Sequence, residues 1–322
     1  MLLFHMRKPS DTNAPAPAVQ MLLIDSEQVG QRVDNFLLRI CKGVPKSHIY
    51  KAIRDGQVRV NKGRIQSDYR LVEGDTVRVP PFRMPAPNAP RAVPPCQFPV
   101  VFEDDALLVI DKPSGVAVHG GSGVSFGVIE QLRAARPDAR LLELAHRLDR
   151  ETSGLLMIAK KRSALVALHE MMREGKGRKR YLALVSGDWV NDRQHIRQPL
   201  LKWLTASGER RVRVDPAGKP AHTIISLQKR LGRYSLLEAE LRTGRTHQIR
   251  VHLASAGFPI VGDDKYGPDE VRDKFTRLGF GRMFLHAYRL DIPHPLTGEL
   301  LALSSPLPPE CQRILSYLEQ QS

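Results

Sequence analysis

Soon after residue 30, the apolar residues recur at the spacing of an amphipathic helix. The first stripe consists of Val33, Phe36, Leu37 and Ile40. After a Gly-Val-Pro break, Ser47 is a candidate N-cap for a second helix, which Gly56 would end. The apolar stripe of this second helix consists of Ile49, Ala52 and Ile53. Alternating residues then predict short strands at 57–60 and 76–79, the first followed by an Asn-Lys-Gly turn.

The chain beyond residue 98 mixes strand and helix patterns irregularly. Strand-like alternation occurs at 107–110, 181–185, 223–227 and 235–241. Helix-like stripes cover 127–135, 163–173 and 246–256. Because several strands follow one another without a helix between them, the pattern favours a mixed α+β sheet over a doubly wound one.

Proline-rich stretches divide the chain into parts. Prolines crowd residues 80–97, which can therefore neither pair as a sheet nor continue a helix, and a semi-rigid linker is expected there. Residues 1–20 are rich in Pro, Ala and Asn and predict a disordered tail. We therefore expect a small domain at 21–79 and a larger one at 98–322, two domains for a chain of 322 residues.

The charge balance points to a polyanionic partner. The chain carries 49 Lys and Arg against 34 Asp and Glu, a formal net charge of +15, which indicates nucleic acid or an anionic membrane surface. The three cysteines are far apart, which argues against a disulfide framework or a zinc module. Since no apolar stretch reaches the ~18 residues of a membrane span, we expect a cytoplasmic protein without a membrane partner.

Basic residues lie off the apolar stripes of the two N-terminal helices. They are Arg32, Arg39, Lys42, Lys46, Lys51 and Arg54. A solvated helix face is the ordinary explanation for any one of them. As a group they outnumber the acidic residues of this stretch, such as Asp55, and this excess favours contact with phosphates. We single out Lys46, Lys51 and Arg54 as candidate RNA-binding residues.

Ionisable groups are densest at residues 146–151, just before an apolar run at 155–159 that predicts a buried strand. They are His146, Arg147, Asp149, Arg150 and Glu151. A polar cluster held against a buried strand is one way in which folds present catalytic groups on rigid support. A plain turn, with Asp149 and Thr152 as caps and Gly154 at a positive φ, is the alternative.

The segment 241–252 holds a second group of basic residues. A helix starting at Thr246 would place Arg245 at its entry, with a guanidinium free to clamp a carboxylate; a basic face turned to solvent or RNA is the alternative. His247 and His252 are five residues apart, the wrong spacing for a shared metal on one helix face. Further on, Asp263 and Asp264 could hold a magnesium ion, although adjacent carboxylates are typical of turns.

Residues 119–127 contain two patterns of serine hydrolases, a His-Gly-Gly loop and a Gly-Val-Ser-Phe-Gly elbow around Ser125. The elbow serine must follow a buried strand, and no strand-like run precedes Gly123. The two patterns are also nearly contiguous, which disfavours a hydrolase. The chain has no phosphate-binding Gly-x-x-x-x-Gly-Lys loop, which argues against an ATPase.

Three segments together resemble the RluA-type family of pseudouridine synthases. They are HRLDRETSG at 146–154, RKRYLALVSG at 178–187 and GRTHQIRVH at 244–252, in matching order and separation. The 31–79 module is similar to the small αL RNA-binding domain first seen in a ribosomal small-subunit protein. The resemblance covers about Asp25 to Leu318. It implies an α+β fold in which the αL domain precedes a synthase domain with a mixed, mainly antiparallel sheet.

The resemblance also implies roles for individual residues. Asp149 stands at the family's essential aspartate and Tyr181 at its active-site tyrosine. Arg245 stands at the basic residue that pairs with the aspartate. Arg147 stands at an arginine that helps to displace the target base from the stack. We add His146, beside Arg147, as a candidate substrate-binding residue.

The implied reaction turns a uridine's carbon–nitrogen glycosidic bond into a carbon–carbon bond. It involves no redox step and no group transfer, so the resemblance implies neither a cofactor nor a metal. The implied partner is 23S ribosomal RNA or a large-subunit assembly intermediate, bound by a monomer. The second alternative is a non-catalytic RNA-binding protein with a degenerate synthase domain. Such a protein is expected to lack Asp149 or Tyr181, and both residues are present. A hydrolase is the third alternative.

Overall fold

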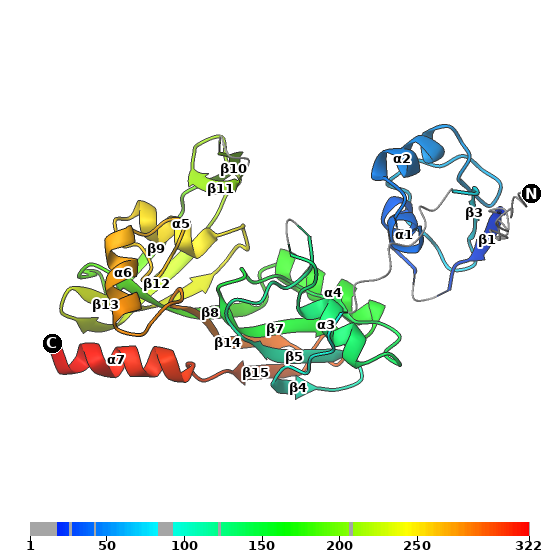
Figure 1. The fold of residues 1–322 in the computed structure, drawn as a ribbon. Helices are drawn as coiled ribbons and strands as arrows, with labels where there is room; N and C mark the ends of the chain where they lie inside the picture. Colours follow the sequence, from blue (N-terminus) through cyan, green and yellow to red (C-terminus); the bar gives the residue numbers. More distant parts are fainter. Residues whose placement is uncertain are drawn as a thin grey trace, which may run out of the picture. The chain divides into compact units, whose positions relative to one another are not determined.

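The computed structural model describes residues 18–25, 28–41, 43–82, 93–121, 124–205 and 209–321. The expected tail up to residue 17, the linker over 83–92 and the basic residue Lys42 lie outside the described residues. The chain divides into two compact units, residues 1–92 and 93–322 (Figure 1). Within the described ranges, no helix is long and apolar enough to cross a membrane.

The first unit packs two short helices against a small antiparallel sheet with the strand order β1-β3-β2. The elements are β1 (Gln20–Leu23), α1 (Val33–Ile40), α2 (Lys46–Arg54), β2 (Arg59–Val60) and β3 (Thr76–Val79). Val33, Leu37 and Ile49 are fully buried, so the predicted apolar stripes face this unit's core.

The start of α2 differs from the prediction. The N-cap is Pro45 and Ser47 lies inside the helix, so the capping role predicted for Ser47 is wrong. Proline suits a helix start because its φ is already close to helical and its missing N–H has no intrahelical acceptor there. At the other end, Gly56 has a φ of +70°, as a residue that terminates a helix requires.

The second unit is built on a ten-stranded sheet with the path β4-β5-β7-β14-β8-β13-β12-β9, on which β15 pairs with β14 and β6 with β7. The strands are β4 (Val100–Glu103), β5 (Leu107–Lys112), β6 (Glu143–Leu144), β7 (Ser153–Ala159), β8 (Arg178–Ser186), β9 (Arg193–Ile196), β12 (Thr223–Leu231), β13 (Tyr234–Leu241), β14 (Leu285–Pro293) and β15 (Leu300–Ser304). Only the pairing of β7 with β14 is parallel among the described strands. The predicted α+β class with a mixed, mainly antiparallel sheet is confirmed.

Helices cover both faces of this sheet, and a hairpin projects from it (Figure 1). The helices are α3 (Val128–Ala135), α4 (Arg162–Arg173), α5 (Gln248–Ser255), α6 (Asp269–Arg277) and α7 (Pro309–Gln321), and the hairpin is β10 (Leu200–Leu204) with β11 (Arg210–Val214). α3 and α5 share one apolar cluster with Tyr181 of β8. α4 packs with Met157 of β7. α6 and α7 meet Leu184 of β8.

The sheet splits beside β7. β14 pairs with β7 only at Ser153 and Gly154. Farther along β7, the incoming chain takes the place of β14. β6 pairs with the end of β7. Ala145 N–H donates to the Met157 carbonyl at 3.0 Å, and Met157 N–H donates to His146 Nε2 at 3.1 Å. The segment that leads to Asp149 is therefore built into the split.

Gly154 sits at the point where the two strands meet. Its φ is +108°, and a Cβ there would lie 2.3 Å from the carbonyl oxygen of Ala287 on β14. Only glycine allows this approach. The positive φ expected for Gly154 is present, and it allows the parallel contact of β7 with β14 next to the loop that carries Asp149.

Candidate active site

A shallow pocket lies where the loop after β6, strand β8 and the start of α5 come together. Its lining includes Arg147 and Asp149 from the loop, Tyr181 from β8, and Arg245 and Arg250 from the segment around α5. Three segments that are far apart in the sequence therefore meet in one place. These are the segments that carry the resemblance described above.

The loop that carries Asp149 is tied to its surroundings by backbone hydrogen bonds. Thr152 N–H donates to the Asp149 carbonyl at 3.1 Å and Gly115 N–H donates to the Arg150 carbonyl at 2.9 Å. The fully buried Lys112 donates from Nζ to the carbonyls of Pro113, Val116 and Arg150 at 2.8, 2.8 and 3.1 Å. Burial lowers the pKa of Lys112 to about 7. These bonds fix the backbone of the loop while the Asp149 side chain keeps 19% of its surface exposed.

The cation beside Asp149 is Arg250. Arg250 Nη1 lies 3.6 Å from Asp149 Oδ2. The pairing predicted for Arg245 is corrected, because Arg245 Nε donates to the carbonyl of Pro220 at 3.1 Å. The reason is the helix start. α5 begins only at Gln248, which leaves Arg245 in the preceding turn and puts Arg250 on a buried part of the helix.

Arg250 is itself held by two carboxylates. Its Nε and Nη2 donate to the two oxygens of the buried Asp263 at 2.7 and 2.5 Å, and Nη2 also donates to Asp264 at 3.0 Å. Burial would lower the pKa of Arg250, but the hydrogen bonds to Asp263 and the charges of Asp263, Asp149 and Asp264 together outweigh it and raise the pKa above its usual range. Asp263 and Asp264, considered above as a possible magnesium site, thus bind the guanidinium of Arg250. The described residues contain no cluster of His, Cys, Asp and Glu that could bind a metal.

Tyr181 forms the apolar wall of the pocket and is 5% exposed. Burial raises the pKa of its hydroxyl, and the charge of Asp149 raises it further. The phenol is therefore neutral at physiological pH, and its ring can stack on a planar base.

His247 is a neighbour of Asp149 whose place the sequence analysis missed. Its Nε2 lies 3.9 Å from Asp149 Oδ1, and its Nδ1 lies 2.7 Å from Tyr266 Oη. Tyr266 Oη also accepts Val212 N–H at 3.0 Å, so this hydroxyl links His247 to β11. Burial lowers the pKa of His247, and Asp149 opposes this. The one feature of the sequence that pointed to His247 as a site residue was its position within the GRTHQIRVH segment.

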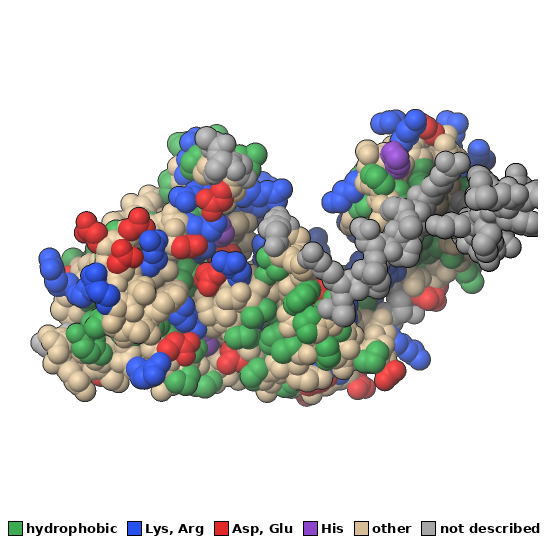
Figure 2. Space-filling view, viewed as in Figure 1, with side chains coloured by type: hydrophobic (Ala, Val, Ile, Leu, Met, Phe, Trp, Pro, Cys, Tyr) green, Lys and Arg blue, Asp and Glu red, His purple; other side chains and the backbone are tan. Residues whose placement is uncertain are grey.

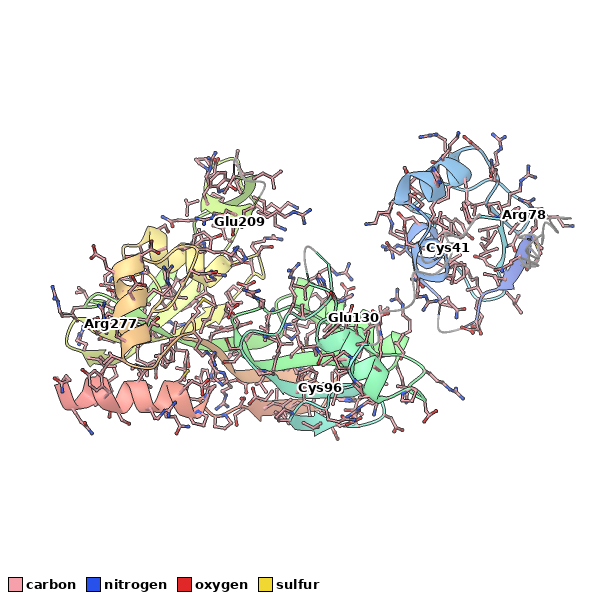
Figure 3. The ribbon with its side chains drawn as sticks, viewed as in Figure 1. Cys41, Arg78, Cys96, Glu130, Glu209 and Arg277 are labelled. Atoms are coloured by element: carbon pink, nitrogen blue, oxygen red, sulfur yellow. The ribbon has the colours of Figure 1, made fainter. Side chains whose placement is uncertain are left out.

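The β10–β11 hairpin is tied to the segment around Tyr266, because Val212 N–H of β11 donates to Tyr266 Oη. Arg211 Nη1 donates to the Lys265 carbonyl at 3.0 Å. Glu209, labelled in Figure 3, accepts from Arg211 Nε at 2.9 Å and also pairs with Lys265. Lys and Arg side chains gather over this hairpin in Figure 2.

The other candidate residues lie in two different settings. Arg147 is exposed at the pocket. His146 uses Nε2 to accept the Met157 N–H, and burial, with a smaller effect of Lys179, lowers its pKa to about 3. The neutral imidazole of His146 thus accepts a backbone hydrogen bond from β7. The substrate-binding role of His146 stays a prediction. In the first unit, exposed basic side chains line α2: Lys46, Lys51 and Arg54.

The glycine-rich segment before α3 is a helix-capping loop. Glu130, labelled in Figure 3, accepts the N–H groups of Gly127 and Gly120 at 2.8 and 3.1 Å. A Cβ at Gly127 would lie 2.5 Å from the Ala117 carbonyl oxygen, so the glycine is needed for close packing. Val124, directly before Ser125, forms an isolated bridge with Gly121 and belongs to no strand. Gly123, the first glycine of the elbow pattern, lies outside the described residues.

Comparisons with known proteins define the class. The family model for RNA pseudouridylate synthase matches residues 106–255, and the S4 domain model matches residues 31–77. Together with the relatives below, these matches show that the chain belongs to the RNA pseudouridylate synthase family. It is a pseudouridine synthase, an isomerase that acts on RNA, preceded by an S4 domain.

The particular relatives share one name. The chain is 51% identical to ribosomal large subunit pseudouridine synthase C of Pasteurella multocida, over 98% of this chain and 99% of the relative. It is 50% identical to the protein of that name from Escherichia coli, over 94% and 97% of the two chains. Among solved structures, human RNA pseudouridylate synthase domain containing 1 matches with a TM-score of 0.56 and 26% identity, covering 69% of this chain and 94% of that one.

Proposed function

We propose that this chain isomerises specific uridines of 23S ribosomal RNA to pseudouridine. The names of its relatives support this choice of RNA. The observation that carries the proposal is the pairing of the Asp149 carboxylate with Arg250 in a pocket walled by the buried Tyr181. This arrangement presents a reactive carboxylate beside an apolar surface for a base.

The reaction needs Asp149 in its ionised form. The C1′–N1 bond of the uridine breaks and a C1′–C5 bond forms, while C5 loses a hydrogen and N1 gains one, so atoms and electrons balance without a cofactor. The carboxylate attacks the sugar, adds to the ring or removes a sugar proton. In each path Arg250 stabilises the charged carboxylate by its proximity.

The target base must first leave the RNA stack, because its reacting atoms are inaccessible within it. Arg147 is exposed at the pocket and occupies the space of the displaced base. Tyr181 stacks on the flipped uracil with its ring. Since its hydroxyl is neutral, Tyr181 acts near C5 as a hydrogen-bonding group and not as a phenolate. Arg245, at the pocket rim, contacts the RNA or supports catalysis from there.

The first unit supplies affinity. Lys46, Lys51 and Arg54 contact phosphates, which position the enzyme on its RNA without reading the target uridine. The enzyme acts as a monomer on 23S ribosomal RNA or on a large-subunit assembly intermediate. The domain limits proposed are 21–79 and 98–322, with a proline-rich linker between them.

Pseudouridine mapping in 23S ribosomal RNA tests the proposal. Cells that lack the gene should lose pseudouridine at specific positions, and the wild-type gene should restore them. The gene with Asp149→Asn should not restore them, although its product is present at the normal level. Identical maps with and without the gene would contradict the proposal and favour a non-catalytic RNA-binding protein.

A further inference from the structure

A second pocket adjoins the active site at Leu241, which lines both. It lies where the sheet splits, between Met157 of β7, α4 and the ends of β8, β13 and β14. Its lining is mainly apolar or glycine, apart from Lys179, Arg242 and Thr243. The pocket thus combines a largely apolar wall with a short list of groups that can bind a charged ligand.

Lys179 is the charged group of this pocket that has no protein partner. Among the described residues, no hydrogen bond and no ion pair involves its ammonium. Burial lowers the pKa of Lys179, and no carboxylate counteracts this. Its neighbour Arg242, in contrast, pairs with Glu240 at 2.9 Å. Lys179 is half-buried and its ammonium has no counter-ion among the described residues, so it is available to pair with an anion that a ligand brings.

The position of Lys179 relates this site to the reaction. Lys179 and Tyr181 are two residues apart on β8, so their side chains leave the strand on the same side, about 6.6 Å apart along it. Lys179 Nζ also lies 3.8 Å from the position of a Cβ on Gly244, one residue before Arg245. An anion at Lys179 is therefore adjacent to the base that lies against Tyr181.

We propose that the ammonium of Lys179, beside this pocket, binds a backbone phosphate of the RNA next to the flipped uridine. A flipped nucleotide is displaced about its backbone, so its flanking phosphates are carried to the mouth of the active site. One of these then meets an ammonium that has no other counter-ion. The inference rests on the proposed function, because it takes the target to be a uridine held against Tyr181.

The substitutions that test the site are chosen around Lys179 and Gly244. Lys179→Met removes the charge and keeps the length of the side chain. Gly244→Glu brings a carboxylate to the ammonium, and Gly244→Ala adds only a methyl group where there is space. Lys176→Met is the matched control, since Lys176 is an exposed lysine three residues away that pairs with Glu174.

The first measurement is binding to a 23S ribosomal RNA transcript over a range of salt concentrations, with Asp149→Asn in every variant to prevent turnover. Lys179→Met and Gly244→Glu should each weaken binding about tenfold, as expected for one charge-assisted contact. Their slopes of log affinity against log salt should become shallower by roughly one unit. The Lys176→Met and Gly244→Ala variants should bind within twofold of their parent. Binding by Lys179→Met at the parental strength would overturn the inference.

A second measurement locates the phosphate. RNA fragments around a modified uridine carry one uncharged methylphosphonate linkage at a time. The parent should lose about tenfold in affinity at one linkage beside the uridine, and Lys179→Met should lose nothing further there. Equal losses in both proteins at every linkage would refute the site. If the wild type modifies no uridine, the proposed function fails, while the transcript binding still decides the role of Lys179. If Lys179→Met unfolds at a lower temperature than its parent, the binding by Gly244→Glu decides the question instead.

Discussion

Arg250 is the residue on which the reaction geometry most depends, and replacing it with lysine tests that dependence. The guanidinium makes three hydrogen bonds to Asp263 and Asp264 and still reaches Asp149 with Nη1. A lysine ammonium is a point donor that cannot form this fork. It can hold Asp263 or approach Asp149, but not both with the same geometry.

The magnitude follows from the bonds lost. A hydrogen bond to a charged group contributes about 1.5–3 kcal/mol, so losing two of the three bonds should lower the unfolding free energy by about 3 kcal/mol. For a unit of this size, that lowers the melting temperature by roughly 6–12 °C. Loss of the Asp149 contact should slow pseudouridine formation by about 100-fold, the typical effect of removing one stabilising donor.

The assay is single-turnover release of tritium from RNA labelled at uridine C5, read together with thermal unfolding. Arg245→Lys, at the rim, is the comparison and should change the rate less than threefold. A double change, Arg250→Met with Asp263→Asn, removes the buried pair completely. It should regain much of the stability that Arg250→Met alone loses, about 3–5 kcal/mol, but none of the activity. If Arg245→Lys slows the reaction more than Arg250→Lys does, our assignment of the pair is refuted.

Three further predictions concern the catalytic aspartate, the loop and the first unit. Asp149→Asn should abolish turnover while RNA binding and melting temperature stay near wild type, and turnover above background would reject Asp149 as the catalytic carboxylate; Ser125→Ala should retain full activity. The pKa of Lys112 is about 7 in the folded chain and 10.5 in its ordinary state, so its contribution to stability is flat below pH 7. Stability should then rise with pH by up to ~1.4 kcal/mol per unit to about 10.5; urea titrations should show this rise in wild type and its loss in Lys112→Met. A protein starting near Phe98 should fold yet bind RNA with a shallower salt dependence, and an unchanged slope would count against the first unit as an RNA contact. The same loss should be reproduced in part by alanine at Lys46, Lys51 and Arg54.

The helices and strands with strong periodicity were predictable, because local burial imposes their pattern. The stripe of α1 and the fully buried β7 are examples. The order of strands in the sheet was not predictable. β14 forms near the end of the chain and inserts between β7 and β8, a pairing between distant segments that leaves no trace in local sequence.

The site illustrates the same limit at the level of one helix turn. The sequence places two arginines, Arg245 and Arg250, in one segment, and a helix start predicted at Thr246 favoured the first. In the structure His247 has a left-handed φ of +53°, and the helix begins one residue later. That turn puts Arg250 and His247 toward Asp149. A two-residue error in a helix start, common in any pattern analysis, was enough to choose the wrong cation.

The split in the sheet makes the order of synthesis matter. Asp149 is made when less than half of the chain exists, yet the strand that closes against Gly154, β14, is formed by residues 285–293. A chain that stops before this strand contains Asp149, Tyr181 and Arg250 but has no parallel partner for the start of β7, and it lacks Leu285 from the pocket wall. We therefore expect catalysis to require the complete chain, because an unfinished chain contains the reactive groups but lacks the strand that aligns them.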